Sequence, residues 1–348
     1  MDELSVGVLS ALVGLAGGTI MGLAVRLGDF CTLGAIESTV YGSDQTRIRM
    51  WGVALGVAIF GTFLLSSFGG LDIDRTLYHA VSWNPWASIF GGLLFGYGMA
   101  YAGNCGFSAL ARIGGGDLRA LVVAIVLAIF AGMTLGGPLA YLRAALFPQD
   151  AAFGPQGFGD LFLQVTGSSP LILATIIAIL LFGWGISYRN LRQSPASLFW
   201  SVMVGLAIVS GWWGTSVIAR ESLGAIDLQS YSFTVPLGRT LGYVMTATAG
   251  GLSFSVGSVL GVVFGGFLGS LIKGHFRWEA CEDPQELGRQ MFGAAMMGIG
   301  GVIALGCSIG QGLSAFSTLA YSAPVSLTAI GVGAVIGLRR LVSGFQPD

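Results

Sequence analysis

Nine long apolar stretches follow one another along the chain, separated by short polar or glycine-containing segments. Each holds roughly 20 residues, the length that an α-helix needs to cross the hydrocarbon core of a bilayer. The pattern therefore predicts an all-α integral membrane protein with about nine transmembrane helices. The predicted spans are residues 5–27, 48–68, 87–104, 119–141, 170–187, 197–218, 251–272, 288–306 and 325–342.

Four further apolar stretches are too short to cross a bilayer and too apolar for exposed loops. We expect them to form re-entrant half-helices, because backbone that ends inside a membrane is tolerated only where protein or a cavity surrounds it. Helices lying flat in the membrane interface are the alternative. The four stretches are residues 30–42, 106–114, 232–247 and 308–320.

Two segments that end in cysteine resemble each other: GGLLFGYGMAYAGNC (91–105) and GAAMMGIGGVIALGC (293–307). The span count makes them run in opposite directions through the membrane. This predicts an inverted internal repeat, an arrangement that places a substrate site near the bilayer midplane.

The repeat divides a single membrane domain, residues 1–348, into three parts. Repeat one covers about 5–141, an outer linker with the fifth span covers about 142–190, and repeat two covers about 197–342. The linker contains Pro and Gly and is not expected to fold as a separate soluble domain.

Composition agrees with a membrane protein. Hydrophobic residues make up 54% of the chain and charged residues only 9%, whereas soluble domains carry about 25% charged residues. The net charge of −1 indicates no nucleic-acid partner. The 57 glycines are spread among the predicted spans, where they allow helices to pack closely.

Lys and Arg are distributed unequally between the two sides of the membrane. With the N-terminus outside, twelve of the 16 basic residues fall on the inner side. This bias predicts an outer N-terminus and a cytoplasmic C-terminus. We expect a multi-pass protein of the bacterial cytoplasmic (inner) membrane. The four outer basic residues are Arg75, Arg143, Arg220 and Arg239.

Three of the four cysteines lie at expected breaks in the membrane segments, in DFC at Cys31, GNCG at Cys105 and GCSIG at Cys307. A helix that begins inside the membrane offers free N–H groups and a positive dipole end to an anion. Thiols are soft and polarisable, and they donate weak hydrogen bonds. We therefore expect the three cysteines to line a path for a small sulfur-containing anion. Cys281 lies in a charged inner loop and is expected to be a bystander.

Polar and glycine neighbours of these cysteines are the next candidates for the path. Amides and hydroxyls bind an anion without burying a charge. Helix capping and packing between helices are the alternative roles for these side chains. The candidates are Asn104, Gln311, Gly106, Ser308 and Ser108.

No metal site, cofactor or catalytic residue is expected. The two histidines, His79 and His275, are far apart in sequence and have no evident carboxylate cluster. The chain has no GxxxxGK[ST] motif, so built-in ATP hydrolysis is not expected. We interpret the protein as a transporter and not as an enzyme.

Three elements together resemble the YeeE/YedE family of sulfur-transport membrane proteins: FCTLGAI, GNCGFSALARIGGGDLRALV and ALGCSIGQGLSAFSTLAYSAP. The resemblance covers roughly residues 5–340. It implies nine spans in an inverted repeat, with short embedded helices that pinch the protein from both faces. It also implies thiosulfate uptake for cysteine synthesis past Cys31, Cys105 and Cys307, and a small cytoplasmic sulfurtransferase as a partner.

Three alternative functions remain open. Relatives in the broader group are linked to selenium or to other sulfur oxyanions, so the transported anion can differ. A membrane thiol–disulfide relay enzyme would need closely paired cysteines, and no C-x-x-C is present. A passive anion channel would conduct without selectivity for sulfur.

Overall fold

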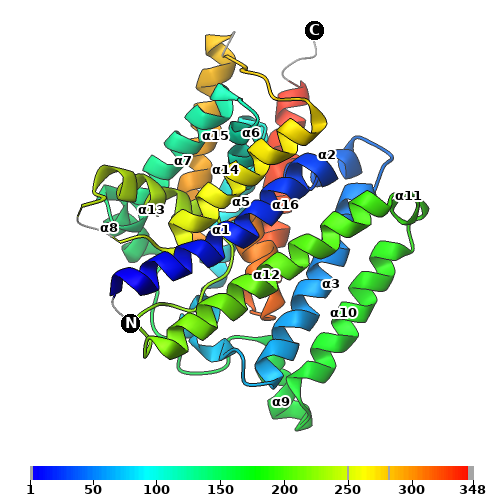
Figure 1. The fold of residues 1–348 in the computed structure, drawn as a ribbon, viewed down its shortest axis with the longest axis vertical. Coiled ribbons are helices and arrows are strands. Elements are labelled where there is room, and N and C mark those ends of the chain that lie inside the picture. The colour runs from blue at the N-terminus through cyan, green and yellow to red at the C-terminus, as the bar shows by residue number, and fades with distance from the viewer. Residues whose placement is uncertain (1–2, 249–250, 281–282, 344–348) are drawn as a thin grey trace.

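A computed structural model describes residues 3–248, 251–280 and 283–343, so Cys281 lies outside the described residues. The described chain is mostly helical, and its β-structure is limited to three isolated β-bridges. Figure 1 shows long helices packed side by side, with shorter helices between and beyond them.

A long helix occupies each stretch that the hydrophobic pattern selected. The boundaries agree closely for most of them. The helices are α1 (Glu3–Gly28), α3 (Thr46–Ser67), α5 (Pro85–Ala102), α7 (Leu118–Leu135), α10 (Pro170–Ile186), α12 (Pro195–Glu221), α14 (Phe254–Lys273), α15 (Pro284–Ile303) and α16 (Ser322–Ser343).

Six helical segments of the described chain are long and apolar enough to cross a membrane. They comprise α1 together with the helix that follows it, α3, α7, α12, α14 and α16. Helix α10 is as apolar but has only 17 residues. The chain is therefore a multi-pass membrane protein.

Short helices form in all four of the short apolar stretches. Three are α2 (Thr32–Val40), α6 (Gly106–Gly114) and α13 (Thr234–Met245). The fourth, which we call the Cys307 helix, covers residues 308–317, and its central part, Gly310–Ala315, is π-helical. Helix α6 and the Cys307 helix are almost wholly buried, as expected for backbone that ends inside the membrane.

The long helices pack in two groups. Helix α1 lies between α14 and α12, while α5 packs against both α16 and α15 (Figure 1). Small residues permit the closest of these contacts: a Cβ atom on Gly257 of α14 would collide with the backbone carbonyl of Ala11 in α1. The glycine spacing in α14 therefore serves packing within the chain.

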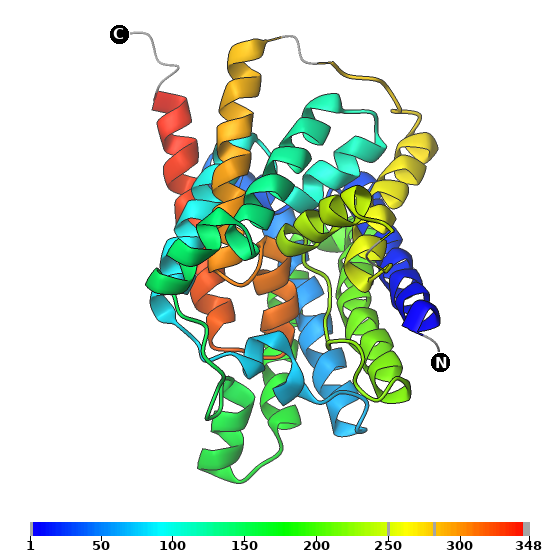
Figure 2. The same cartoon turned by 90° about the vertical axis from the view of Figure 1, so that its left-hand side faces the viewer.

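Five further short helices connect the long ones. Figure 2 shows the start of α15 and the end of α16 at one end, and the green helix α9 at the opposite end. The short helices are η1 (Ile73–Arg75), α4 (Leu77–Ala80), α8 (Pro138–Leu146), α9 (Phe158–Thr166) and α11 (Arg189–Gln193).

Candidate functional site: converging helix starts at three thiols

Each of the three described cysteines stands directly before a short helix. Cys31 precedes α2, Cys105 precedes α6, and Cys307 precedes the Cys307 helix. In each case the cysteine carbonyl accepts the first helical hydrogen bond, from the N–H four residues later. The cysteines are thus the N-caps of three helices.

A left-handed residue lies two positions before every one of these cysteines. The φ angles are +55° at Asp29, +72° at Gly103 and +58° at Leu305. L-residues other than glycine rarely adopt this conformation. The chain therefore makes a sharp reversal at three separate places to begin a new helix at a thiol.

Two of the sulfur atoms accept hydrogen bonds from the helix that they cap. Cys31 Sγ lies 3.5 Å from the Gly34 nitrogen, and Cys307 Sγ lies 3.4 Å from the Gly310 nitrogen. Each sulfur satisfies one of the free N–H groups of the first turn. Because the sulfur acts as acceptor here, its own S–H stays available to donate to a ligand.

Ser108 connects Cys31 with Cys105. Its Oγ lies 3.3 Å from Cys31 Sγ and 3.5 Å from Cys105 Sγ. The hydroxyl therefore bridges thiols that belong to two different half-helices. All three described cysteines are free thiols.

The third thiol joins this group through one side-chain and one backbone hydrogen bond at the helix starts. Thr32, the first residue of α2, donates to the Oγ of Ser308, the first residue of the Cys307 helix, over 3.1 Å. The Phe233 N–H, at the start of α13, donates to Cys307 Sγ over 3.3 Å. The starts of α2, α13 and the Cys307 helix thus meet, and Ser108 links α6 to them.

This convergence defines the electrostatics of the site. Each helix start carries unsatisfied N–H groups and a partial positive charge. Thiols and hydroxyls surround them, and neither group carries a formal charge in its ordinary state. The arrangement is suited to a small anion that must also leave again.

A pocket of about 190 Å³ opens near Cys307. Ser232 lines it and lies 3.8 Å from Cys307 Sγ through its Oγ. Two cations, Arg143 and Arg239, also line this pocket. We call it the outer pocket, because both arginines lie in segments that the charge bias assigns to the outside.

A second pocket, of about 410 Å³, opens beside Cys31. Ser108 and Asn104 line it as well. The Asn104 side chain is buried, yet its Oδ1 has no hydrogen-bond partner in the structure. We call this space the inner pocket.

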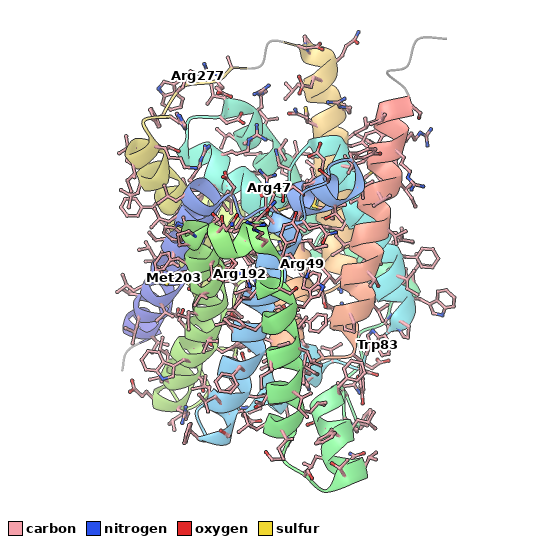
Figure 3. The ribbon with its side chains drawn as sticks, turned by 90° about the vertical axis from the view of Figure 1, so that its right-hand side faces the viewer. Arg47, Arg49, Trp83, Arg192, Met203 and Arg277 are labelled. Carbon is pink, nitrogen blue, oxygen red and sulfur yellow. The ribbon has the colours of Figure 1, made fainter. Side chains whose placement is uncertain are left out.

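Arginines surround the inner pocket. Arg26 and Arg112 line it together with Arg47, and Arg47 has no ion-pair partner among the residues that the structure describes. Figure 3 shows Arg277 near one end of the molecule, Arg47 further in but in the same half, and Trp83 in the other half. The inner pocket therefore opens toward the Arg-rich side of the molecule, the side that the charge bias assigns to the cytoplasm.

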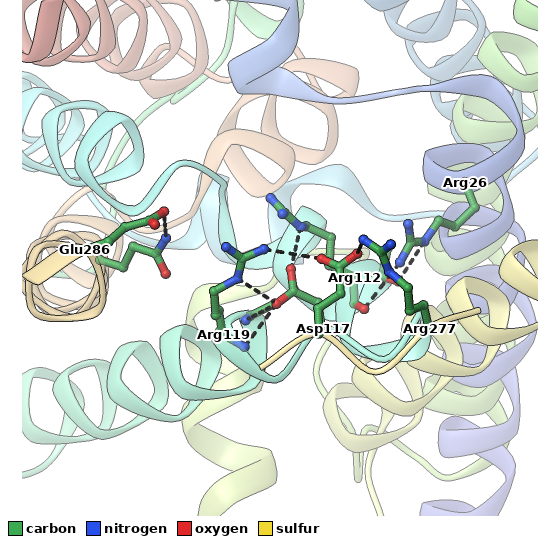
Figure 4. Close-up of polar contacts among 10 residues, drawn as sticks. Arg26, Arg112, Asp117, Arg119, Arg277 and Glu286 are labelled. Carbon is green, nitrogen blue, oxygen red and sulfur yellow. Dashed lines mark hydrogen bonds and ion pairs between the residues drawn. The ribbon is translucent and has the colours of Figure 1, made fainter. Parts of the chain in front are cut away.

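An ion-pair network holds the rim of the inner pocket. Figure 4 shows Asp117 between Arg112 and Arg119, with distances of 2.9 and 3.6 Å. Arg119 also pairs with Glu279 at 3.2 Å. Arg26 donates to the last carbonyls of α6, including Ala111 O at 3.2 Å, and so holds the end of that half-helix.

Two stacked aromatic rings lie next to pocket residues in the sequence: Phe107 precedes Ser108 of the inner pocket, and Phe233 follows Ser232 of the outer pocket. Phe107 of α6 stacks on Phe233, with ring centroids 5.0 Å apart, and both side chains are fully buried. Gly106 fits tightly beside them, because a Cβ there would lie 3.2 Å from Leu127 and 3.3 Å from Leu237. We call the Phe107–Phe233 pair the aromatic barrier.

Gln311 differs from the other predicted site residues. Its Nε2 donates to Ala304 O over 2.6 Å, and its Oε1 accepts from Ser322 over 3.2 Å. Both ends of the amide are therefore bonded to nearby residues of the chain, Ala304 and Ser322, in the capping role that the sequence left open. A contact of Gln311 with the anion stays a prediction.

Several residues of the site were not predicted. Ser232, Phe233, Thr32 and Arg47 lie at the thiols or line the pockets. The sequence does mark the segment 232–247 as a short apolar element, but no cysteine within it draws attention to its first residues. A search for the start of every short helix would have found Phe233.

The expectation that no carboxylates lie near His79 is wrong. The structure brings Asp74 of η1 and Asp160 of α9 beside it. Asp160 stands 81 positions from His79, so no local motif reveals that contact, whereas Asp74 stands only five positions before the histidine.

The fold and this arrangement of helix starts are those of a membrane transport protein for a small anion. The chain belongs to the sulphur transport family, whose model matches residues 27–336. Its relatives are named transporters, not enzymes.

Two curated relatives match over nearly the whole chain. Thiosulfate transporter TsuA of Spirochaeta thermophila is 25% identical over 321 residues, which cover 89% of this chain and 92% of the relative. Thiosulfate transporter TsuA of Escherichia coli K12 is 22% identical over 346 residues, covering 92% of each.

Proposed function

We propose that the protein takes up thiosulfate across the bacterial cytoplasmic membrane, along a path lined by Cys31, Cys105 and Cys307. The convergence of four half-helix starts at the three thiols carries this proposal. Membership of the sulphur transport family and the names of both relatives support the substrate. The protein has no built-in ATP hydrolysis in this proposal.

The proposed route begins in the outer pocket, where Arg143 and Arg239 attract the anion. The anion then meets the S–H of Cys307, passes the aromatic barrier, and reaches Cys105. The anion then hydrogen-bonds to Ser108 and next to Cys31 at the inner pocket. Each step exchanges one weak donor for another, so no covalent bond forms.

The helix pairing supports an inverted repeat with nine spans. In this scheme α1, α3, α5 and α7 correspond to α12, α14, α15 and α16. The contact between α1 and α14 then corresponds to the contact between α12 and α3. In the same way, the contact between α5 and α16 corresponds to the contact between α15 and α7. The half-helices correspond in the same way, α2 with α13 and α6 with the Cys307 helix.

The proposed orientation has the N-terminus outside and the C-terminus in the cytoplasm. Arginines at the inner pocket support it. The same face is where a small cytoplasmic sulfurtransferase would collect the anion as it leaves past Cys31. This partner is proposed from the family resemblance.

Uptake of radiolabelled thiosulfate into proteoliposomes tests the proposal. Cys105→Ala and Cys307→Ala are expected to lower uptake about tenfold each, because a hydrogen bond to a charged group contributes about 1.5–3 kcal/mol. Cys281→Ser is the matched control and is expected to transport normally. Unchanged uptake in both alanine variants would contradict a transport path lined by these thiols.

Competing anions in the same assay separate the alternatives. Excess sulfite, selenite and sulfate are added in parallel, and thiosulfate is expected to compete best. Comparable flux of sulfate and thiosulfate would indicate a passive anion channel. Activity that requires a Cys31–Cys105 disulfide, trapped under oxidising conditions, would indicate a thiol–disulfide relay.

A further inference from the structure

A cluster of metal-ligating side chains lies away from the thiol path. Asp74 of η1, His79 of α4 and Asp160 of α9 each present a donor atom, and these atoms all lie within 4.8 Å of one another. They line a cleft of about 380 Å³ at the same end of the molecule as α9. In the proposed orientation this is the outer face.

The imidazole of His79 is fixed in one tautomer. The residue is only 6% exposed, and its Nε2 lies 3.2 Å from the carbonyl oxygen of Thr318. Because a carbonyl only accepts, Nε2 carries the proton and donates it. Metal-binding histidines show this same pattern, in which the far nitrogen is held by a backbone carbonyl.

The other ring nitrogen faces the carboxylates. His79 Nδ1 is buried and has no hydrogen-bond partner among the described residues, and it lies 3.7 Å from Asp160 Oδ2. Asp160 Oδ2 is likewise buried, with no hydrogen-bond partner in the described part of the chain. Buried polar atoms are nearly always hydrogen-bonded, so two such atoms facing each other without a hydrogen bond call for a further partner.

Negative charge in the cleft also lacks a cationic side chain. Among the described residues, no Lys or Arg forms an ion pair with Asp74 or Asp160. A cation placed among the three donors would balance the negative charge of the two carboxylates.

We propose that Asp74, His79 and Asp160 bind a divalent transition-metal ion, with Zn²⁺ as the best fit. One imidazole and two carboxylates form a donor set that Zn²⁺ accepts, whereas Mg²⁺ and Ca²⁺ prefer oxygen alone. Ligands about 2.0–2.2 Å from a tetrahedral ion lie about 3.3–3.6 Å apart, close to the 3.7 Å between Nδ1 and Oδ2.

The proposed ion would connect three segments that are distant in sequence. It joins the loop after α3 to the linker helix α9, and through His79 it reaches Thr318, directly after the Cys307 helix. Binding therefore holds the outer segments against a half-helix of the thiol path. The site itself does not depend on which anion is transported.

Cobalt binding to the purified, EDTA-treated full chain in detergent tests the site. Co²⁺ is expected to bind once per chain, with visible absorption bands that Zn²⁺ abolishes by displacement. Loss of an outer-shell partner weakens metal binding about 10–100-fold, so Asp160→Asn and His79→Ala are each expected to weaken it about 100-fold or more. Asp72→Asn is the control, since Asp72 lines the same cleft outside the cluster.

Thermal unfolding gives an independent readout. Zn²⁺ is expected to raise the Tm of the wild type and of Asp72→Asn but not that of Asp160→Asn. Because Asp160→Asn preserves the shape of the side chain, it still tests the site if His79→Ala folds poorly. The proposal is overturned if the wild type binds neither Co²⁺ nor Zn²⁺ saturably. It is also overturned if both ligand variants bind as tightly as the wild type, or if only pH, and not metal, shifts the Tm.

Discussion

At the scale of single residues, two amides that look equivalent in sequence differ in their surroundings. Asn104 and Gln311 both stand close to a cysteine. Asn104 leaves its Oδ1 unpaired at the inner pocket, whereas both ends of Gln311 are bonded to the chain. The sequence predicts that both lie near thiols, but it cannot tell which is satisfied, because the partner Ser322 reaches Gln311 only through the fold.

Replacement of Asn104 is expected to change transport more than stability. Its amide N–H₂ can donate to an anion in the inner pocket, so Asn104→Ala should raise the KM for thiosulfate about tenfold. The Tm should stay close to that of the wild type. Concentration-dependent uptake and a thermal melt measure the two effects, with the exposed Asn190→Ala as control. An unchanged KM would contradict a substrate-facing Asn104.

Replacement of Gln311 is expected to do the reverse. Gln311→Ala leaves the Ala304 carbonyl without its donor in a fully buried setting. An unsatisfied buried group costs about 1–3 kcal/mol, so the free energy of unfolding should fall by that amount. Thermal melts report the loss, and uptake normalised to folded protein reports transport. A normal Tm with a raised KM would instead place Gln311 on the path.

At the scale of helices, the hydrophobic pattern predicts positions better than partners. It places helices at all nine long stretches and at the four short ones. It cannot reveal that the four short helices start at one place, because that convergence depends on contacts such as Thr32 with Ser308, 276 residues apart. The π-helical turns in Gly310–Ala315 likewise have no marker in the sequence.

The α1–α14 contact gives a prediction at this scale. A Cβ on Gly261 would collide with the backbone of Leu15 in α1. Gly261→Leu is therefore expected to lower stability by about 1–3 kcal/mol through overpacking. Gly331→Leu, on α16, is the control because a Cβ there meets no atom within 4 Å. Size-exclusion profiles and thermal melts compare the two, and equal stability would contradict the packing role.

At the scale of the whole molecule, the proposed route runs from the outer pocket past the aromatic barrier to the inner pocket, so the barrier is expected to limit leakage of other anions. Phe233→Leu removes the ring that stacks on Phe107. Sulfate flux should rise relative to thiosulfate flux, since a shorter side chain opens the gap between the pockets. Phe90→Leu is the control on an exposed side chain. Unchanged selectivity in proteoliposome uptake would show that the barrier lies elsewhere.

The position of each thiol relative to the barrier determines the face from which a reagent reaches it. Cys31 is half-buried and lines the inner pocket, whereas Cys105 and Cys307 are only 1% and 2% exposed. In a Cys281→Ser background, a membrane-impermeant maleimide should therefore label Cys31 in inside-out vesicles and not in right-side-out vesicles. Thiosulfate should slow this labelling, because the anion and the reagent compete for the same thiol. Labelling of Cys31 from both faces would mean that the barrier does not separate the pockets, and labelling from the outer face alone would reverse the proposed orientation.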